Sequence, residues 1–244
     1  MAPNEPGYFA MKFDRGLDWY TSLFATARDD EIVGETTPRY TRLGHSEVAA
    51  SRMSALLPDI KLVFVARHPI QRLISDYRHL SRLAQLDAPI LDVVQEPGNP
   101  IVGASCYFSR LEPYIKAYPR DRLCVVRFED VVAEHGVGWN RILDHLGLSP
   151  RPAPGHARNV TAELAQVSPT MVRLGAARRR LGLPNPPRWA SKIGRAVARS
   201  ARTEYRDPLD GEVPALPPAV LEQIWDDVAR LETWLGVSAP LWER

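Results

Sequence analysis

The residues with the clearest potential for chemistry lie in residues 61–77, where a short apolar run leads directly into a predicted helix. Residues 61–66 are mostly apolar and bounded by turn-forming residues, a pattern typical of a buried strand in a parallel sheet. Arg67 closes this run, and Pro69 stands at the first helical position, where its missing N–H costs nothing. An arginine beside a helix N-terminus favours an anion, because the planar guanidinium and the free N–H groups both attract negative charge. Ser75 would add a hydroxyl donor two turns into the helix; the alternative is an ordinary strand–helix unit whose arginine covers a surface.

Predicted strands and helices alternate along residues 1–150, which indicates an α/β fold with a parallel β-sheet flanked by helices. Residues 150–155 form a linker-like break, and residues 151–244 are predicted to be a helical, basic C-terminal part of the same domain. Ser46 is a plausible N-cap for one of the helices. The predicted strands are 31–35, 61–66 and 123–128, and the main predicted helices are 46–57, 69–85, 104–117, 138–146 and 217–235.

The composition is that of an ordinary globular protein of 244 residues, with 45% hydrophobic and 25% charged residues. No apolar run approaches the ~20 residues that span a bilayer, and no signal-peptide pattern stands at the N-terminus, so we expect a cytoplasmic protein without a membrane span. The two cysteines, Cys106 and Cys124, have neither metal-ligand spacing nor a disulfide framework. We therefore expect no metal site, and we expect Cys124 to be a small core residue.

The net charge of +2 conceals a strong asymmetry along the chain. Residues 151–206 contain 12 Lys/Arg against 2 Asp/Glu, so the remainder is net acidic. This stretch is either a solvated helix face or a basic rim that attracts an anionic nucleotide or acceptor. Nucleic-acid binding is disfavoured, because the stretch lacks interleaved aromatic residues and a recognisable module.

Five further segments accompany residues 61–77. They are Glu-Pro-Gly-Tyr-Phe at 5–9, Gly-Leu-Asp-Trp-Tyr with a following Leu-Phe at 16–24, Gly-Glu-Thr-Thr-Pro-Arg-Tyr at 34–40, a helix, Tyr-Pro, strand, Phe-Glu-Asp and Leu-Gly-Leu series at 107–148, and Leu-Gly followed by Trp at 235–242. In this order they resemble the sulfotransferases that use 3′-phosphoadenosine 5′-phosphosulfate (PAPS), in particular the heparan-sulfate-type and bacterial members. In residues 61–77 the corresponding family pattern is a strand, Arg-Asp-Pro, and a helix with Ser eight residues after the Arg. Here His68 stands in place of the Asp.

The resemblance implies a P-loop-like nucleotide-binding fold and transfer of a sulfuryl group from PAPS, without a metal, to a hydroxyl of a carbohydrate or a small metabolite. It also implies roles for particular residues. These are Glu5 as the base that takes the acceptor proton, Arg67 and Ser75 as ligands of the 3′-phosphate, Asn159 as a nucleotide contact, and Trp19 and Tyr20 as either acceptor-stacking residues or core anchors.

One part of the family pattern has no counterpart in the printed sequence. Relatives begin with a strand and a Gly/Ser/Thr/Lys-rich loop that cradles the 5′-phosphosulfate, and no Gly-x-x-x-x-Gly-Lys or similar loop occurs here. Since such a strand lies within the sheet, its loss is expected to leave unpaired strand edges. We therefore expect either a start codon placed too far downstream or a truncated chain.

Two alternatives remain open at this stage. The first is an inactive or fragmentary sulfotransferase-like protein that binds a nucleotide or a partner. The second is a P-loop kinase, in which Asp130 after strand 123–128 would help to hold Mg²⁺. The Phe-Glu-Asp sequence at 128–130 fits the sulfotransferase pattern better.

Overall fold

The computed structural model describes residues 5–153 and 207–244, apart from residues 29, 84, 85, 87, 134, 135 and 210. Asn159 and most of the basic stretch lie outside the described residues. The elements are α1 (Tyr8–Met11), η1 (Phe13–Arg15), α2 (Leu17–Ser22), η2 (Pro38–Thr41), α3 (Ser46–Leu56), β1 (Leu62–Ala66), α4 (Pro69–Arg82), α5 (Ile90–Gln95), α6 (Pro100–Ser105), α7 (Tyr107–Ala117), η3 (Arg120–Arg122), β2 (Leu123–Arg127), α8 (Phe128–Val132), α9 (Val137–Leu146) and α12 (Pro218–Leu235).

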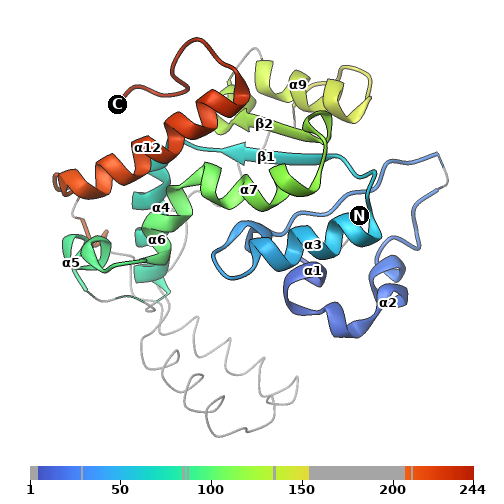
Figure 1. The fold of residues 1–244 in the computed structure, drawn as a ribbon, viewed down its shortest axis with the longest axis horizontal. Helices are drawn as coiled ribbons and strands as arrows, with labels where there is room; N and C mark the ends of the chain where they lie inside the picture. The colour runs from blue at the N-terminus through green and yellow to red at the C-terminus, as the bar shows by residue number, and fades with distance from the viewer. Residues whose placement is uncertain are drawn as a thin grey trace, which may run out of the picture.

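The sheet in the described part of the chain consists of β1 and β2, which pair in parallel with helices around them (Figure 1). The register runs from Leu62 opposite Leu123 to Ala66 opposite Arg127. Parallel strands need a crossover between them, and here the chain from α4 to η3 provides it. The α/β prediction with a parallel sheet is therefore confirmed.

The two faces of this sheet are covered to different extents. On one face, alternate residues of both strands pack with Trp225, Val228 and Leu231 of α12 and with residues of α7. On the other face, α9 covers β2 through Ile142, which packs with Cys124 and Val126.

The half of the second face that belongs to β1 is open. Val63 is 37% exposed and Val65 is 45% exposed, although both lie opposite buried residues of β2. The prediction of a strand buried on both faces is wrong for β1, because no described helix packs over these two valines. The core position predicted for Cys124 is confirmed, since it is 6% exposed.

The N-terminal part of the chain has its own core, made of aromatic rings. Tyr8 stacks on Tyr20 with 4.6 Å between ring centroids, and Phe9 meets Tyr20 and Tyr40 edge-on. Residues of α3 and α7, including Met53 and Tyr114, close this cluster. Figure 1 shows α1 and α2 on the side of the molecule where β1 begins, whereas α4 follows its carboxyl end.

Four local predictions need correction. Residues 31–35 form no strand, because they pair with no described strand, and Ile32 and Val33 are exposed. The predicted helix 104–117 is two helices, α6 and α7, separated at Cys106 with φ −85° and ψ 82°. Ser46 is the first residue of α3 and is buried, so it is not the N-cap. The unpaired strand edges expected from the missing loop are the outer edges, because β1 and β2 bond directly to each other.

The remaining helices follow the predicted pattern. α12 covers Pro218–Leu235, close to the predicted 217–235, and buries Ile224, Val228 and Leu231 on one face. α4 ends at Arg82, three residues earlier than expected. Among the helices in the described part of the chain, none combines the length and apolarity that crossing a membrane requires.

Candidate active site

The candidate site lies where the two strands end. Ala66 is paired with Arg127, so the residues that follow, Arg67 and Phe128, emerge side by side at the same edge of the sheet. Ligands of open α/β sheets bind at this carboxyl edge, because the loops and helix N-termini gather there. The sequence-predicted anion site therefore lies at the edge where such sites occur.

The Arg67 side chain is half-buried and lacks a carboxylate partner among the described residues. Its Nη2 atom donates to Oε1 of Gln71 at 3.4 Å, and the guanidinium carbon lies 6.0 Å from the Phe128 ring centroid. The backbone at this position is fixed, since the Tyr107 hydroxyl donates to the Arg67 carbonyl at 2.6 Å. An anchored arginine whose charge is not neutralised by any of the described carboxylates can bind an anion.

Ser75 lies two turns into α4 and is half-buried. Within the described structure its hydroxyl has no hydrogen-bond partner. Gln71, which contacts Arg67, precedes Ser75 by four residues, so their side chains share one face of α4. The two residues predicted to hold a phosphate thus lie along one side of the strand–helix junction, and whether they bind it remains a prediction.

The start of α4 is held by the Phe-Glu-Asp segment. Glu129 accepts from the His68 N–H at 2.8 Å and from Nε1 of Trp242 at 3.2 Å. One N–H near the helix N-terminus is therefore already occupied, which reduces the number of free donors that the sequence suggested. The same contacts explain why the Phe-Glu-Asp and closing Trp segments occur together, since one carboxylate joins both to the junction.

Asp130 is committed to an ion pair. Its two oxygens accept from Nε and Nη2 of Arg127 at 2.8 and 2.5 Å, and Nη1 of Arg127 donates to the Leu241 carbonyl at 2.6 Å. A carboxylate whose oxygens both face a guanidinium is poorly placed to hold Mg²⁺. The geometry therefore disfavours the kinase role considered for Asp130.

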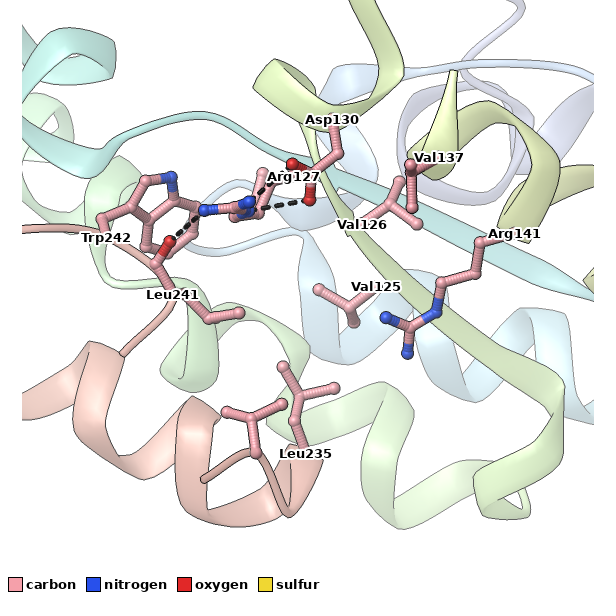
Figure 2. A pocket seen from close by; sticks show the side chains of 12 residues that line it. Val125, Val126, Arg127, Asp130, Val137, Arg141, Leu235, Leu241 and Trp242 are labelled. Atoms are coloured by element: carbon pink, nitrogen blue, oxygen red, sulfur yellow. Dashed lines mark hydrogen bonds and ion pairs between the residues drawn. The ribbon is translucent and has the colours of Figure 1, made fainter. Parts of the chain in front are cut away.

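These contacts form one wall of a small pocket of about 80 Å³ beside β2 (Figure 2). Arg127 and Asp130 line it together with Arg141 of α9 and apolar residues from β2 and the C-terminal segment. Arg67 and Ser75 do not line this pocket, although Ala66 does. The pocket adjoins the junction but is separate from the predicted phosphate ligands.

Arginines also gather beside α4. Arg110 is 4% exposed, and its Nε donates to the Gly103 carbonyl at 2.7 Å. Burial, the largest cause, and the nearby charges of Arg72 and Arg42 together lower the pKa of Arg110 to about 10, while Asp76 opposes them. The contributions of Arg72 and Arg42 show that positive charges gather around Arg110, and such a group of cations favours anions.

The residues predicted for the acceptor side form a second group. Glu5 is exposed and has a left-handed backbone with φ 54°. It is the one non-glycine residue of the described chain with a positive φ. Trp19 is half-buried, with the Arg15 guanidinium 4.2 Å and the Lys12 ammonium 5.6 Å from its ring centroid. The ring of Tyr20 is 8% exposed and stacked on Tyr8, so the structure favours the core-anchor alternative for Tyr20 over acceptor stacking.

The two groups are not in contact with each other. Glu5 precedes α1 on the side where β1 begins, whereas Arg67 follows the opposite end of β1 (Figure 1).

A hydroxyl network, in which Tyr20, Thr37 and Tyr40 donate to the Glu35 carboxylate, lies beside the Glu5 segment. This network was not predicted from the sequence. Its only signal was the Gly-Glu-Thr-Thr-Pro-Arg-Tyr segment at 34–40.

Comparison with known proteins agrees with this arrangement. A family model described as the sulfotransferase family matches residues 15–152, more than half of the chain. The chain belongs to the sulfotransferase family. The match includes Arg67 and Ser75, whereas Glu5 precedes it.

Individual relatives point the same way. The chain is 31% identical over 152 residues to human heparan sulfate glucosamine 3-O-sulfotransferase 6, covering 59% of this chain and 44% of that protein. It is 29% identical over 154 residues to the human 3B1 enzyme, covering 59% of this chain and 38% of the relative. The chain therefore spans less than half the length of the curated relatives it matches.

The sulfotransferase fold is also found by structural comparison. The crystal structure of a sulfotransferase from Alicyclobacillus acidocaldarius superimposes with a TM-score of 0.59 at 19% identity. The alignment covers 94% of this chain and 75% of the other.

Proposed function

We propose that the protein transfers the sulfuryl group of PAPS to a carbohydrate hydroxyl. The observation that carries the proposal is the junction of β1 and α4, where an arginine and a serine hydroxyl share one side, the first without a carboxylate partner and the second without a hydrogen bond among the described residues. A phosphate monoester suits such a pair, because a guanidinium binds two of its oxygens and a hydroxyl can donate to the third. In PAPS the 3′-phosphate would occupy this place.

The separation between the Arg67–Ser75 pair and the acceptor-side residues around Glu5 is compatible with PAPS as the sulfuryl donor. PAPS carries its 3′-phosphate and its sulfuryl group at opposite sides of the ribose, so the residues that hold one need not touch those that act on the other. In the proposed reaction the acceptor oxygen attacks sulfur, the bond between sulfur and the 5′-phosphate oxygen breaks, and the leaving phosphate keeps the electron pair. Glu5 takes the proton of the acceptor hydroxyl.

Trp19 supports a carbohydrate as acceptor. An aromatic face is a common contact surface for sugars, and here two cations lie against the same ring. An anionic sugar would find both features in one place. The names of the relatives, heparan sulfate glucosamine 3-O-sulfotransferases, make heparan sulfate the first acceptor to test.

Substitution of Glu5 tests the proposal. Glu5→Gln keeps the size of the side chain but cannot accept the proton, so transfer from labelled PAPS to heparan sulfate should fall about 100-fold or more. Binding of 3′-phosphoadenosine 5′-phosphate should be unchanged in the same variant. Glu222→Gln, at an exposed position on α12, serves as the matched control and should retain wild-type activity. Normal turnover by Glu5→Gln would refute the assignment of Glu5 as the base.

A second candidate is nucleotide binding without transfer. It keeps the nucleotide ligands predicted at Arg67 and Ser75 but assigns no transfer to the protein. Tight binding of 3′-phosphoadenosine 5′-phosphate by the full-length protein, with no transfer to heparan sulfate or to a phenol, would support this candidate. Preference for ATP over 3′-phosphoadenosine 5′-phosphate would contradict both.

A further inference from the structure

Glu35 lies at the centre of a hydroxyl network beside the Glu5 segment. Its carboxylate is half-buried and faces three hydroxyl groups of the protein. Oε1 accepts from the Tyr40 hydroxyl at 2.6 Å, and Oε2 accepts from Thr37 Oγ1 at 2.8 Å. A third, longer bond of 3.4 Å joins the Tyr20 hydroxyl to Oε1.

Two of these hydroxyls continue to the backbone about 30 residues earlier in the chain. The Gly7 N–H donates to Thr37 Oγ1 at 3.2 Å, and the Phe9 N–H donates to the Tyr40 hydroxyl oxygen at 3.4 Å. A hydroxyl has one proton, and the carboxylate of Glu35 can only accept. Each hydroxyl therefore donates to Glu35 and presents its lone pairs to an N–H, so the carboxylate fixes the direction of both chains of hydrogen bonds.

The chains of hydrogen bonds act on the part of the backbone that begins α1. The N–H groups at the start of a helix have no partner within the helix, and these two are bonded by side chains from η2 and the residue before it. The preceding turn is unusual, with φ 54° at Glu5 and φ 67° at Gly7. A left-handed non-glycine residue persists where the surrounding structure holds it, and such residues are concentrated at functional sites.

The protonation of the tyrosine agrees with this arrangement. Burial and the neighbouring Glu35 carboxylate raise the pKa of Tyr40 far above its ordinary value. Its hydroxyl therefore keeps the proton that it donates. The aromatic rings of Tyr8 and Phe9, which are 2% and 1% exposed, anchor the other side of the same segment.

We propose that Glu35 is the positioning residue that sets the conformation of residues 5–9 through Thr37 and Tyr40, and thereby aims Glu5. This inference rests on the proposed role of Glu5 as the base. Glu35 itself touches neither donor nor acceptor in this account, and it acts through the two hydroxyls alone.

Matched variants separate positioning from general packing. Glu35→Gln replaces one of the two acceptor oxygens by an NH2 donor, Thr37→Val removes one relay hydroxyl, and Thr37→Ser restores it. Tyr20→Phe is the control within the cluster, because its hydroxyl reaches the same carboxylate and connects to no backbone N–H of a described residue. The two readouts are amide hydrogen exchange at Gly7 and Phe9, measured by NMR, and steady-state transfer from PAPS to heparan sulfate.

The expected results differ between the variants. Glu35→Gln and Thr37→Val should each increase exchange at Gly7 at least about tenfold, as expected when a hydrogen bond of roughly 1.4 kcal/mol is lost. They should lower kcat by about 100-fold with the KM for PAPS unchanged, since a misplaced base slows the chemical step and not binding. Thr37→Ser and Tyr20→Phe should behave like the wild type.

Two results would overturn the inference. One is unchanged exchange at Gly7 in both Glu35→Gln and Thr37→Val. The other is a loss of kcat in Tyr20→Phe as large as that in Thr37→Val. This result would show that the network only contributes to packing and does not position Glu5. Exchange decides the positioning claim even if the wild-type protein transfers no sulfuryl group, and absence of transfer with the expected exchange pattern would count against the proposed function alone.

Discussion

At the residue scale, the sequence predicted which side chains stand at the strand–helix junction. Arg67, Pro69 and Ser75 could be placed because their roles depend on local order: a strand end, a helix start and a position two turns later. The contacts of Glu129 and Glu35 could not be predicted in the same way. Glu129 bonds directly to distant residues, and the Thr37 and Tyr40 hydroxyls that donate to Glu35 accept from backbone N–H groups about 30 residues earlier, so neighbouring residues give no sign of these connections.

Tyr20 illustrates the same limit. The Trp-Tyr pair at 19–20 gave no means of telling a stacking surface from a core anchor, because both uses favour an aromatic ring. The structure separates the two residues: Trp19 is half-buried, with a cation 4.2 Å from its ring centroid, and Tyr20 is buried in the aromatic core.

Gly7 supports a prediction at this scale. Its backbone is left-handed, with φ 67° and ψ 25°, and an added Cβ would lie 2.7 Å from Cε of Met11. Gly7→Ala should lower the free energy of unfolding by about 1–2 kcal/mol, because an L-residue is strained in this conformation. Urea denaturation measures the change.

Gly34→Ala provides the control. Gly34 is exposed, has no positive φ, and an added Cβ there would meet nothing within 4 Å. Its substitution should change stability by less than about 0.5 kcal/mol. Equal losses in the two variants would show that the left-handed conformation of Gly7 is not the cause.

At the element scale, predictions succeeded where a pattern is local and failed where an element needs a partner. α12 and α4 followed from apolar spacing and from the prolines that begin them. Residues 31–35 have the composition of a strand, but a strand exists only when another strand bonds to it, and none of the described strands does so.

The division between α6 and α7 has a similar explanation. Asp227 of α12 is 5% exposed and accepts from the N–H groups of Phe108 and Ser109, at 2.7 and 3.0 Å, and from the Ser109 hydroxyl. These groups belong to the first turn of α7, so a carboxylate more than 100 residues away completes this helix start. The break at Cys106 therefore depends on tertiary contact.

Asp227→Ala should be strongly destabilising. It leaves two backbone N–H groups and a hydroxyl without their acceptor in a poorly hydrated place, which should lower the free energy of unfolding by roughly 2–3 kcal/mol. Thermal and urea denaturation measure the loss. Asp226→Ala, at the exposed neighbouring position, should remain close to the wild type. A change below about 0.5 kcal/mol in Asp227→Ala would contradict the capping role.

At the scale of the whole molecule, the order of the segments along the sequence predicted the family correctly. The sequence did not predict which faces of the sheet are covered by helices. Burial of β1 on both faces was inferred from apolar residues alone, but apolar composition does not say whether a covering element is present. Val63 and Val65 remain exposed beside buried partners on β2. Fold class could be predicted because it depends on the alternation of elements, which the chain displays throughout residues 61–146.

The central claim concerns the molecule as a binder of one particular phosphate. If the junction of β1 and α4 holds the 3′-phosphate, the protein must discriminate between adenosine nucleotides that differ only in this group. The two donors involved, Arg67 and Ser75, are free of competing partners among the described residues except for the long bond to Gln71. Arg67→Lys keeps the charge but removes the planar fork.

Isothermal titration calorimetry with 3′-phosphoadenosine 5′-phosphate and adenosine 5′-phosphate is the most direct measurement. The wild-type protein should bind the first ligand more tightly. Arg67→Lys and Ser75→Ala should each weaken that binding, by about tenfold or more for Arg67→Lys, while leaving adenosine 5′-phosphate almost unaffected. Equal affinity of the wild type for both ligands, or unchanged discrimination in Arg67→Lys, would contradict the account.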